Sequence, residues 1–176
     1  GRVPTRTPAG RCRVPETGRI VARSSDAVVV RSWFPGERER SFTDWWTCRR
    51  GDGRRVLLER RYDSLDAYPS TYLDTFVLAG SHLAYAVHTA FTHYGDRMDS
   101  VAVLDLAGRA PAHVLPGGDF GPFGYVAGDY RLTGVAVNAS GEVAWTEVSD
   151  RARVWVLRRG ASAPELVATA PLAFLT

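Results

Sequence analysis

Chemistry-bearing side chains are densest in one short segment of the sequence. His88, His93, Tyr94, Asp96 and Asp99 fall within twelve residues, and imidazole and carboxylate groups commonly ligate metals or carry protons. On a continuous strand His88 and His93 would point to opposite faces, because side chains alternate along a strand. A loop bend just before His93 would bring it near Asp96. We expect solvated side chains or local hydrogen bonds here, with a metal or acid–base site as the alternative, and we expect no cofactor.

Sequence signatures of covalent catalysis and of phosphate binding are missing. There is no G-x-S-x-G motif, and the glycine-rich run 117–124 lacks the lysine and the following helix of a phosphate loop. Paired carboxylates remain open, because glycosidases collect theirs from segments that sequence spacing does not reveal. Acidic candidates for such a glycan-acting hydrolase are Asp96, Asp99, Asp119 and Asp129. We assign no reaction and keep the hydrolase as an alternative.

The two cysteines, Cys12 and Cys48, indicate a disulfide rather than a zinc site, since there is no C-x-x-C motif. The sequence opens at Gly1 and its only methionine is Met98, so we expect that a leader has been removed. In an exported chain two cysteines usually pair. We therefore predict a Cys12–Cys48 disulfide that ties down the N-terminal segment of a secreted, periplasmic or cell-envelope protein. Two free thiols in a cytosolic protein are the alternative.

Charge is distributed unevenly along the chain. Residues 1–62 hold 15 arginines against seven acidic residues, and residues 63–176 hold seven arginines against 12 acidic residues. Acidic side chains interrupt the basic half, so we expect no nucleic-acid partner. All 22 basic residues are arginine, a bias that is typical of GC-rich coding sequences and points to a high-GC bacterium. No apolar run approaches roughly 18 residues, which predicts no membrane span.

Aromatic residues concentrate in the predicted loops. The stretches 34–42, 62–74, 91–100 and 116–130 hold 11 of the 19 aromatic residues in 47 of the 176 positions. Such rings suit stacking on a sugar, a peptide or another protein, although long loops also use aromatics to pack on themselves. With one histidine included, the residues that we expect to bind a ligand are Phe34, Tyr68, Tyr72, Phe91, His93, Tyr94, Phe120, Phe123, Tyr125 and Tyr130.

An internal repeat predicts the elements that position these side chains. The motif W-x-x-R-R-G occurs at 46–51 and at 155–160, and the segment 101–108 between them ends in a glycine at the same position. Three copies are therefore predicted, about 55 residues apart, each with four short strands joined by turn-forming residues. The expected strands are 19–23, 26–30, 46–51 and 55–59, then 75–79, 82–86, 101–108 and 112–115, and finally 132–137, 142–146, 155–160 and 165–168.

Segments of the third copy carry a family resemblance. Gly141-Glu-Val-Ala-Trp145 is followed by Arg153-Val-Trp-Val-Leu-Arg-Arg-Gly160 and Glu165-Leu-Val167, which resembles the blades of TolB-like and WD40-like β-propellers. The second copy is similar. The first copy lacks the glycine before its second strand, and no copy has the Gly-His or Trp-Asp signatures of WD40. The resemblance implies an all-β fold of three four-stranded antiparallel propeller-like blades.

The predicted domain organisation is an arm followed by one domain. Residues 1–18 are rich in proline and are expected to be extended, and residues 19–176 form the β-propeller-like domain, with repeats at about 19–61, 75–116 and 132–170. Propellers close with about four to eight blades, so three blades need completion. A homodimer would give a six-bladed ring, residues 1–18 and 169–176 would give a fourth blade, or the chain is a fragment.

The expected function is non-catalytic binding. An exported bacterial binding or scaffold module would recognise a protein or glycan ligand of the cell envelope through the aromatic-rich loop face. A glycan-acting hydrolase of the propeller type is one alternative. A structural self-assembly module, which associates through open blade edges, is the other.

Overall fold

Every regular element in the described part of the chain is a β-strand. The computed structural model describes residues 12–36, 41–62, 70–90, 97–108, 113–116, 131–149 and 151–171, without the side chains of 97 and 113–116. Twelve strands in these residues form antiparallel sheets, so the all-β prediction is confirmed. None of the described residues belongs to a helix that is long and apolar enough to cross a membrane.

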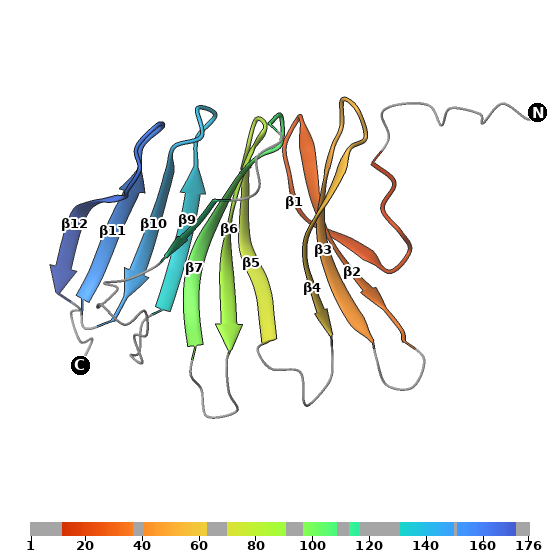
Figure 1. The fold of residues 1–176 in the computed structure, drawn as a ribbon, viewed down its shortest axis with the longest axis horizontal. Coiled ribbons are helices and arrows are strands. Elements are labelled where there is room, and N and C mark those ends of the chain that lie inside the picture. Colours follow the sequence, from red (N-terminus) through yellow and green to blue (C-terminus); the bar gives the residue numbers. More distant parts are fainter. Residues whose placement is uncertain are drawn as a thin grey trace, which may run out of the picture.

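Each of the three sheets consists of four strands that follow one another in the sequence. The first sheet contains β1 (Gly18–Arg23), β2 (Ala27–Phe34), β3 (Phe42–Arg49) and β4 (Arg55–Tyr62). The second contains β5 (Ser70–Ala79), β6 (His82–Ala90), β7 (Arg97–Asp105) and β8 (His113–Pro116). The third contains β9 (Arg131–Val137), β10 (Val143–Val148), β11 (Arg151–Leu157) and β12 (Glu165–Pro171). The sheets lie in sequence order along the long axis of the molecule (Figure 1).

All predicted strand segments overlap strands of the structure, but several boundaries differ. β3 begins at Phe42, inside a predicted loop. It ends at Arg49, two residues early, because a turn follows in which the Gly53 N–H donates to the Arg49 carbonyl at 2.9 Å. Residues 70–74 and 97–100, which were predicted to be loop, belong to β5 and β7.

The described parts of the two ends do not form the fourth blade that was one of the predicted closures. Residues 169–171 lengthen β12 of the third sheet. Residues 12–17 form no strand and lie against the first sheet. The closure by terminal strands stays a prediction, because residues 1–11 and 172–176 lie outside the described part of the chain.

The middle strands are buried on both faces, which explains their composition. Ala27-Val-Val-Val30 of β2 and Leu83-Ala-Tyr-Ala86 of β6 are buried at every position. Consecutive side chains of a strand point to opposite faces, so a run without polar alternation requires cover on both sides. Valine and aromatic residues suit such packed strands. The second sheet is covered on one face by the first sheet and on the other by the third.

Two hydrophobic cores join the sheets. Between the first and second sheets, the buried side chains include Ala27, Val29 and Trp45 on one side and Leu83, Tyr85 and Leu104 on the other. Between the second and third sheets, they are Ala84, Val101, Val143 and Trp145. The alternation of Leu83 and Ala84 between the two cores follows from the period of the strand.

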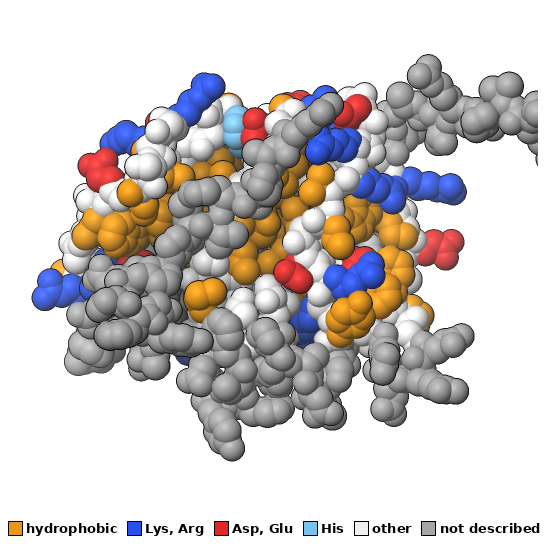
Figure 2. All heavy atoms as spheres, in the orientation of Figure 1, with side chains coloured by type: hydrophobic (Ala, Val, Ile, Leu, Met, Phe, Trp, Pro, Cys, Tyr) orange, Lys and Arg blue, Asp and Glu red, His pale blue; other side chains and the backbone are white. Residues whose placement is uncertain are grey.

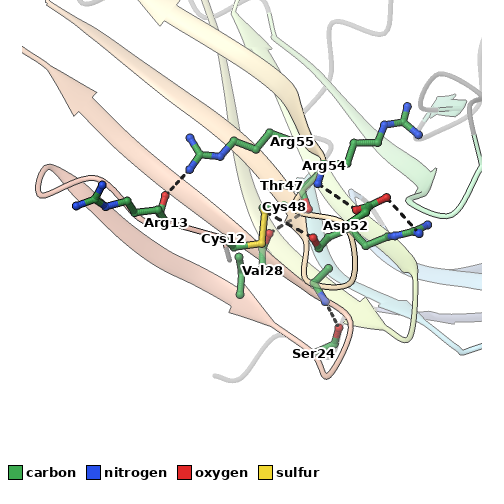
Figure 3. The surroundings of a disulfide bond; sticks show 11 residues. Cys12, Arg13, Ser24, Val28, Thr47, Cys48, Asp52, Arg54 and Arg55 are labelled. Atoms are coloured by element: carbon green, nitrogen blue, oxygen red, sulfur yellow. Dashed lines mark hydrogen bonds and ion pairs between the residues drawn. A yellow bond between two sulfur atoms is a disulfide. The ribbon is translucent and has the colours of Figure 1, made fainter. Parts of the chain in front are cut away.

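A third apolar cluster lies on the outward face of the first sheet. Val28, Val30, Trp46 and Cys48 form it, and the segment of residues 12–17, here called the strap, packs against it through Cys12 and Val14. Cys12 and Cys48 are joined by a disulfide, as predicted. Figure 3 shows the Arg55 guanidinium reaching the strap, where it donates to the Arg13 carbonyl at 2.6 Å. The strap therefore covers the part of this face nearest the disulfide.

Candidate functional site

Three aromatic rings form a row at the other end of the same outward face. Phe34, Phe42 and Tyr62 are direct cross-strand neighbours on β2, β3 and β4. The rings of Phe34 and Phe42 are stacked with centroids 4.9 Å apart, and those of Phe42 and Tyr62 are tilted at 6.1 Å. Phe42 lies six residues from Cys48 on the same strand, so the row sits at the opposite end of the face from the disulfide.

A bidentate ion pair lies next to this row. The Arg60 guanidinium donates to both oxygens of Asp44 at 2.7 Å and lies over the ring of Phe42, with its carbon 4.3 Å from the centroid. The hydrogen bonds that Arg60 donates to Asp44 raise the pKa of Arg60 above its ordinary value, so this group is a permanent cation. Asp44 is 10% exposed and Arg60 is 40% exposed. The guanidinium is therefore fixed in orientation and still reachable from solvent.

A β-bulge creates this pairing. Trp46 pairs with Leu57. If this register continued along the two strands without a bulge, Glu59 would lie opposite Asp44, and two negative charges would be in contact. The register shifts between Trp45 and Trp46, so that Arg60 takes the position opposite Asp44. The extra residue in β4 turns a repulsive contact into an attractive one.

The outward face of β4 extends the row toward the strap. The Arg55 guanidinium lies over Trp46 at 4.6 Å from its ring centroid, and Leu57, the next residue on this face, is 54% exposed. At the far end Tyr62 is 52% exposed. Phe34, Phe42, Arg55, Leu57, Arg60 and Tyr62 are called the aromatic–arginine face below. Figure 2 shows basic side chains beside apolar ones at this N-terminal end of the molecule.

A second polar cluster, the His88 cluster, lies in the second sheet. His88 is 4% exposed, and its Nδ1 atom is 2.7 Å from Oδ1 of Asp99 on β7. Its Nε2 atom is 2.9 Å from Oδ1 of Asp74 on β5. The Tyr72 ring stacks on the imidazole at 4.5 Å. Asp99 also accepts a hydrogen bond at 3.3 Å from the Leu132 N–H of β9, so this cluster connects the second sheet to the third.

Asp74 reaches His88 because of a strained bulge in β5. The register shifts between Asp74 and Val77, and Thr75 has a φ of 50°. A β-branched residue in the left-handed region is a genuine outlier and costs free energy. The Thr75 hydroxyl donates to Oδ1 of Asp74 at 2.9 Å. The strained turn therefore directs the carboxylate toward the imidazole.

The chemistry open to His88 is limited by its two carboxylate neighbours. Burial lowers the pKa of His88, but the hydrogen bonds and charges of Asp99 and Asp74 outweigh burial and raise the pKa above its ordinary value. The imidazolium form donates from both nitrogens, which leaves neither nitrogen for a metal or for proton abstraction. Among the described residues no group of three or more His, Cys, Asp or Glu side chains is placed to hold a metal ion.

The third sheet has a buried ion pair on the face that it turns toward the second sheet. Glu147 is 1% exposed, pairs with Arg153 across β10 and β11, and lies 3.5 Å from its guanidinium. Glu147 follows Trp145 on the same face of β10, as His88 follows Ala84 on β6. The second sheet therefore has a buried ionic group near the C-terminal end of β6, and the third sheet has one near the C-terminal end of β10.

Of the ten predicted ligand-binding residues, two lie in the described part of the chain. Phe34 belongs to the aromatic–arginine face, and Tyr72 belongs to the His88 cluster, with one ring face against the imidazole. These two residues lie in separate clusters. Outside the described residues are Tyr68, Phe91, His93, Tyr94, Phe120, Phe123, Tyr125 and Tyr130.

Among the predicted acidic residues, Asp99 is the one that the structure describes. It is 2% exposed and bonded to His88 and Leu132, which is not the solvent-facing position that a glycosidase carboxylate needs. No motif in the sequence distinguishes Asp44, Arg60 or Asp74. Their partners are set by bulges, and the alternation of polar and apolar residues does not reveal where a bulge occurs.

Comparison of the chain with protein-family models, with curated proteins and with solved structures finds no match. What the protein does is therefore inferred from its own geometry.

Proposed function

We propose that the chain is a non-catalytic binding module of an exported protein, in which three propeller-like blades present the aromatic–arginine face to a cell-envelope ligand. One observation carries this proposal. Tyr62 is 52% exposed beside an Arg60 guanidinium that Asp44 holds in place at 2.7 Å. A rigid ring next to an oriented donor is typical of recognition surfaces, because little side-chain entropy is lost on binding.

A recurring contact between neighbouring sheets supports the propeller-like arrangement. The β5–β6 turn approaches the start of β2, where a Cβ on Gly80 would lie 3.8 Å from Asp26. The β9–β10 turn approaches the start of β6, where a Cβ on Gly141 would lie 2.7 Å from His82. Both glycines have positive φ values, 58° and 85°. The second and third sheets thus each contact the preceding sheet through a glycine that lies just before their second strand, β6 or β10.

The corresponding turn of the first sheet differs. Ser24 and Ser25 occupy it, and the Ser24 hydroxyl accepts from the N–H groups of Asp26 and Ala27 and donates to the Gly80 carbonyl at 3.2 Å. This turn therefore interacts with the second sheet and has no glycine for a contact on its other side. This difference supports the proposal that the outward face of the first sheet contacts the strap and a ligand, and not another blade.

The disulfide supports the proposed export. Cys12 and Cys48 are joined, and disulfides persist in secreted, periplasmic and cell-surface proteins rather than in the reducing cytosol. The bond also holds the strap on the first sheet.

The proposal is tested by screening the oxidised protein against an array of glycans and purified envelope proteins. We expect saturable binding that weakens in a Tyr62→Ala variant and no release of cleaved product. The matched control is Leu166→Ala, which removes a side chain of 44% exposure from β12. Absence of binding, product release, or equal loss in the two variants would contradict the proposed function.

A further inference from the structure

We propose that the ligand of the aromatic–arginine face is an acidic polysaccharide, a sugar polymer that carries carboxylate or sulfate groups. This inference rests on the proposed function and names the class of ligand. It follows from three features of the face: an exposed tyrosine at the end of a row of rings that crosses three strands, an arginine without a carboxylate partner, and, among the described residues, the absence of a further sheet over it.

The row of rings suits a sugar ligand. Phe34, Phe42 and Tyr62 come from three neighbouring strands, which lie about 4.8 Å apart in a sheet. Their centroid separations of 4.9 and 6.1 Å show that the row runs across the strands. Aromatic rings present flat apolar surfaces for the C–H faces of sugar rings. The Phe34 and Phe42 rings stack on each other, and the Arg60 guanidinium lies over Phe42. The exposed Tyr62 is therefore the ring on which a sugar can stack, and Phe42 supports it from the neighbouring strand.

The cations of this face favour a ligand with negative charge. The Arg55 guanidinium stacks on Trp46 and donates to the Arg13 carbonyl. In the described part of the chain neither Arg13 nor Arg55 forms an ion pair with a carboxylate. The charge of the face is therefore complementary to an anionic polymer.

Arg60 adds direction to the attraction. Its Nε and one terminal nitrogen donate to Asp44, and the guanidinium also interacts with the Tyr62 side chain, so this planar group is held in a fixed orientation beside the exposed ring. Because Asp44 balances its charge, Arg60 orients a ligand hydroxyl or carboxylate, while Arg55 supplies uncompensated charge. The strap and its disulfide hold the Arg13 carbonyl, which accepts the hydrogen bond from the Arg55 guanidinium.

The test measures binding of the oxidised protein to polygalacturonate, heparin and neutral dextran by titration calorimetry, at low and at high salt. Polygalacturonate carries carboxylates and heparin carries sulfates, so the two arms distinguish the source of charge. We expect saturable binding to at least one acidic polymer, weaker binding at high salt because the charges are screened, and no binding to dextran.

Two variants locate the binding. Tyr62→Ala removes the exposed ring and is expected to weaken binding about two- to tenfold. Arg55→Gln removes an uncompensated charge and is expected to weaken binding and to flatten its salt dependence. The matched controls on the third sheet are Leu166→Ala and Arg158→Gln, whose side chains are 44% and 61% exposed. Thermal unfolding checks that each variant is folded, and the controls are expected to bind like the unmodified protein.

Poly-glutamate and duplex DNA serve as competitors that are anionic but contain no pyranose chain. Equal competition by either would overturn the proposal, because charge alone would explain the binding. Equal binding to dextran, or equal loss in Tyr62→Ala and Leu166→Ala, would overturn it as well. If another ligand class on the array binds and Tyr62→Ala weakens it, the proposed function stands and the ligand class assigned here is wrong.

Discussion

The Nδ1 atom of His88 lies 2.7 Å from the Oδ1 atom of Asp99, its direct neighbour across β6 and β7. Because Asp74 holds the other nitrogen at 2.9 Å, the imidazole bridges all three of β5, β6 and β7. Asp99 also accepts a hydrogen bond from the Leu132 N–H of the third sheet. His88 therefore stabilises the carboxylate that connects the second sheet to the third.

The stability of the protein is expected to fall as pH rises above about 6.5. The pKa of folded His88 is raised by Asp99 and Asp74 against the opposing effect of burial, whereas the unfolded chain has the ordinary value. The stabilisation is therefore fully present below the unfolded pKa and is lost as pH rises through the folded pKa. Urea unfolding between pH 6 and pH 9 measures the slope.

Two variants connect that slope to His88. His88→Gln is expected to lower the free energy of unfolding at pH 6 by about 1–3 kcal/mol and to flatten the pH dependence over this range. Asp74→Asn removes one of the two carboxylates and is expected to make the slope shallower. An unchanged slope in His88→Gln would show that another group controls it.

Reduction of the disulfide is expected to destabilise the protein. Cys12 and Cys48 are 36 residues apart in sequence, and a loop of this size typically contributes about 2–4 kcal/mol to the free energy of unfolding. Intact mass before and after reduction should differ by two hydrogen atoms, and chemical unfolding of a Cys12→Ser, Cys48→Ser variant measures the loss. Labelling of both thiols without a reductant would contradict the bond.

The glycine contact between the second and third sheets is tested by Gly141→Ala. A methyl group there would lie 2.7 Å from the His82 ring, on a backbone with a φ of 85°. Gly160→Ala is the matched control, because Gly160 has a similar φ of 77° and nothing within 4 Å. The control is expected to lose about 1–2 kcal/mol from strain alone, and Gly141→Ala is expected to lose more.

A double-mutant cycle separates the two terms. In a His82→Ala background the cost of Gly141→Ala should approach that of Gly160→Ala, since the ring that the methyl group meets is gone. Equal costs for the two glycine variants in the unmodified background would mean that the sheets do not meet at this point.

The protein is expected to be a monomer in solution. In a six-bladed ring of two copies, the third sheet of one copy would pack on the outward face of the first sheet of the other copy. In this protein Cys12 and Val14 pack on that face, and the turn at Ser24 and Ser25 lacks the glycine of the other contacts. Light scattering on the oxidised protein should give 19.3 kDa. Twice this mass at all concentrations would contradict the account.

The sequence predicted the strands and the disulfide because both depend on local or simple features. Runs such as Ala27-Val-Val-Val30 lack polar alternation and have β-branched side chains, so they indicate buried strands regardless of register. With two cysteines there is one possible intramolecular pairing. The strand boundaries were predicted less accurately, because cross-strand pairing with β2 extends β3 to include Phe42 and Thr43.

The polar clusters were not predictable, because they depend on bulges. Arg60 pairs with Asp44 only after the register slips by one residue, and Asp74 reaches His88 only through the left-handed Thr75. Neither slip changes the composition of its strand. Sequence analysis therefore found Phe34 and Tyr72 as aromatic residues but did not identify the charged side chains beside them.

Hydrogen–deuterium exchange with and without saturating acidic polysaccharide tests the central claim most directly, because it locates the bound ligand on the fold. The account predicts slower amide exchange at the end of β2, the start of β3 and the end of β4, around Phe34, Phe42 and Tyr62, with no change in β12. Protection confined to β12, or to the second and third sheets, would contradict a ligand site on the aromatic–arginine face.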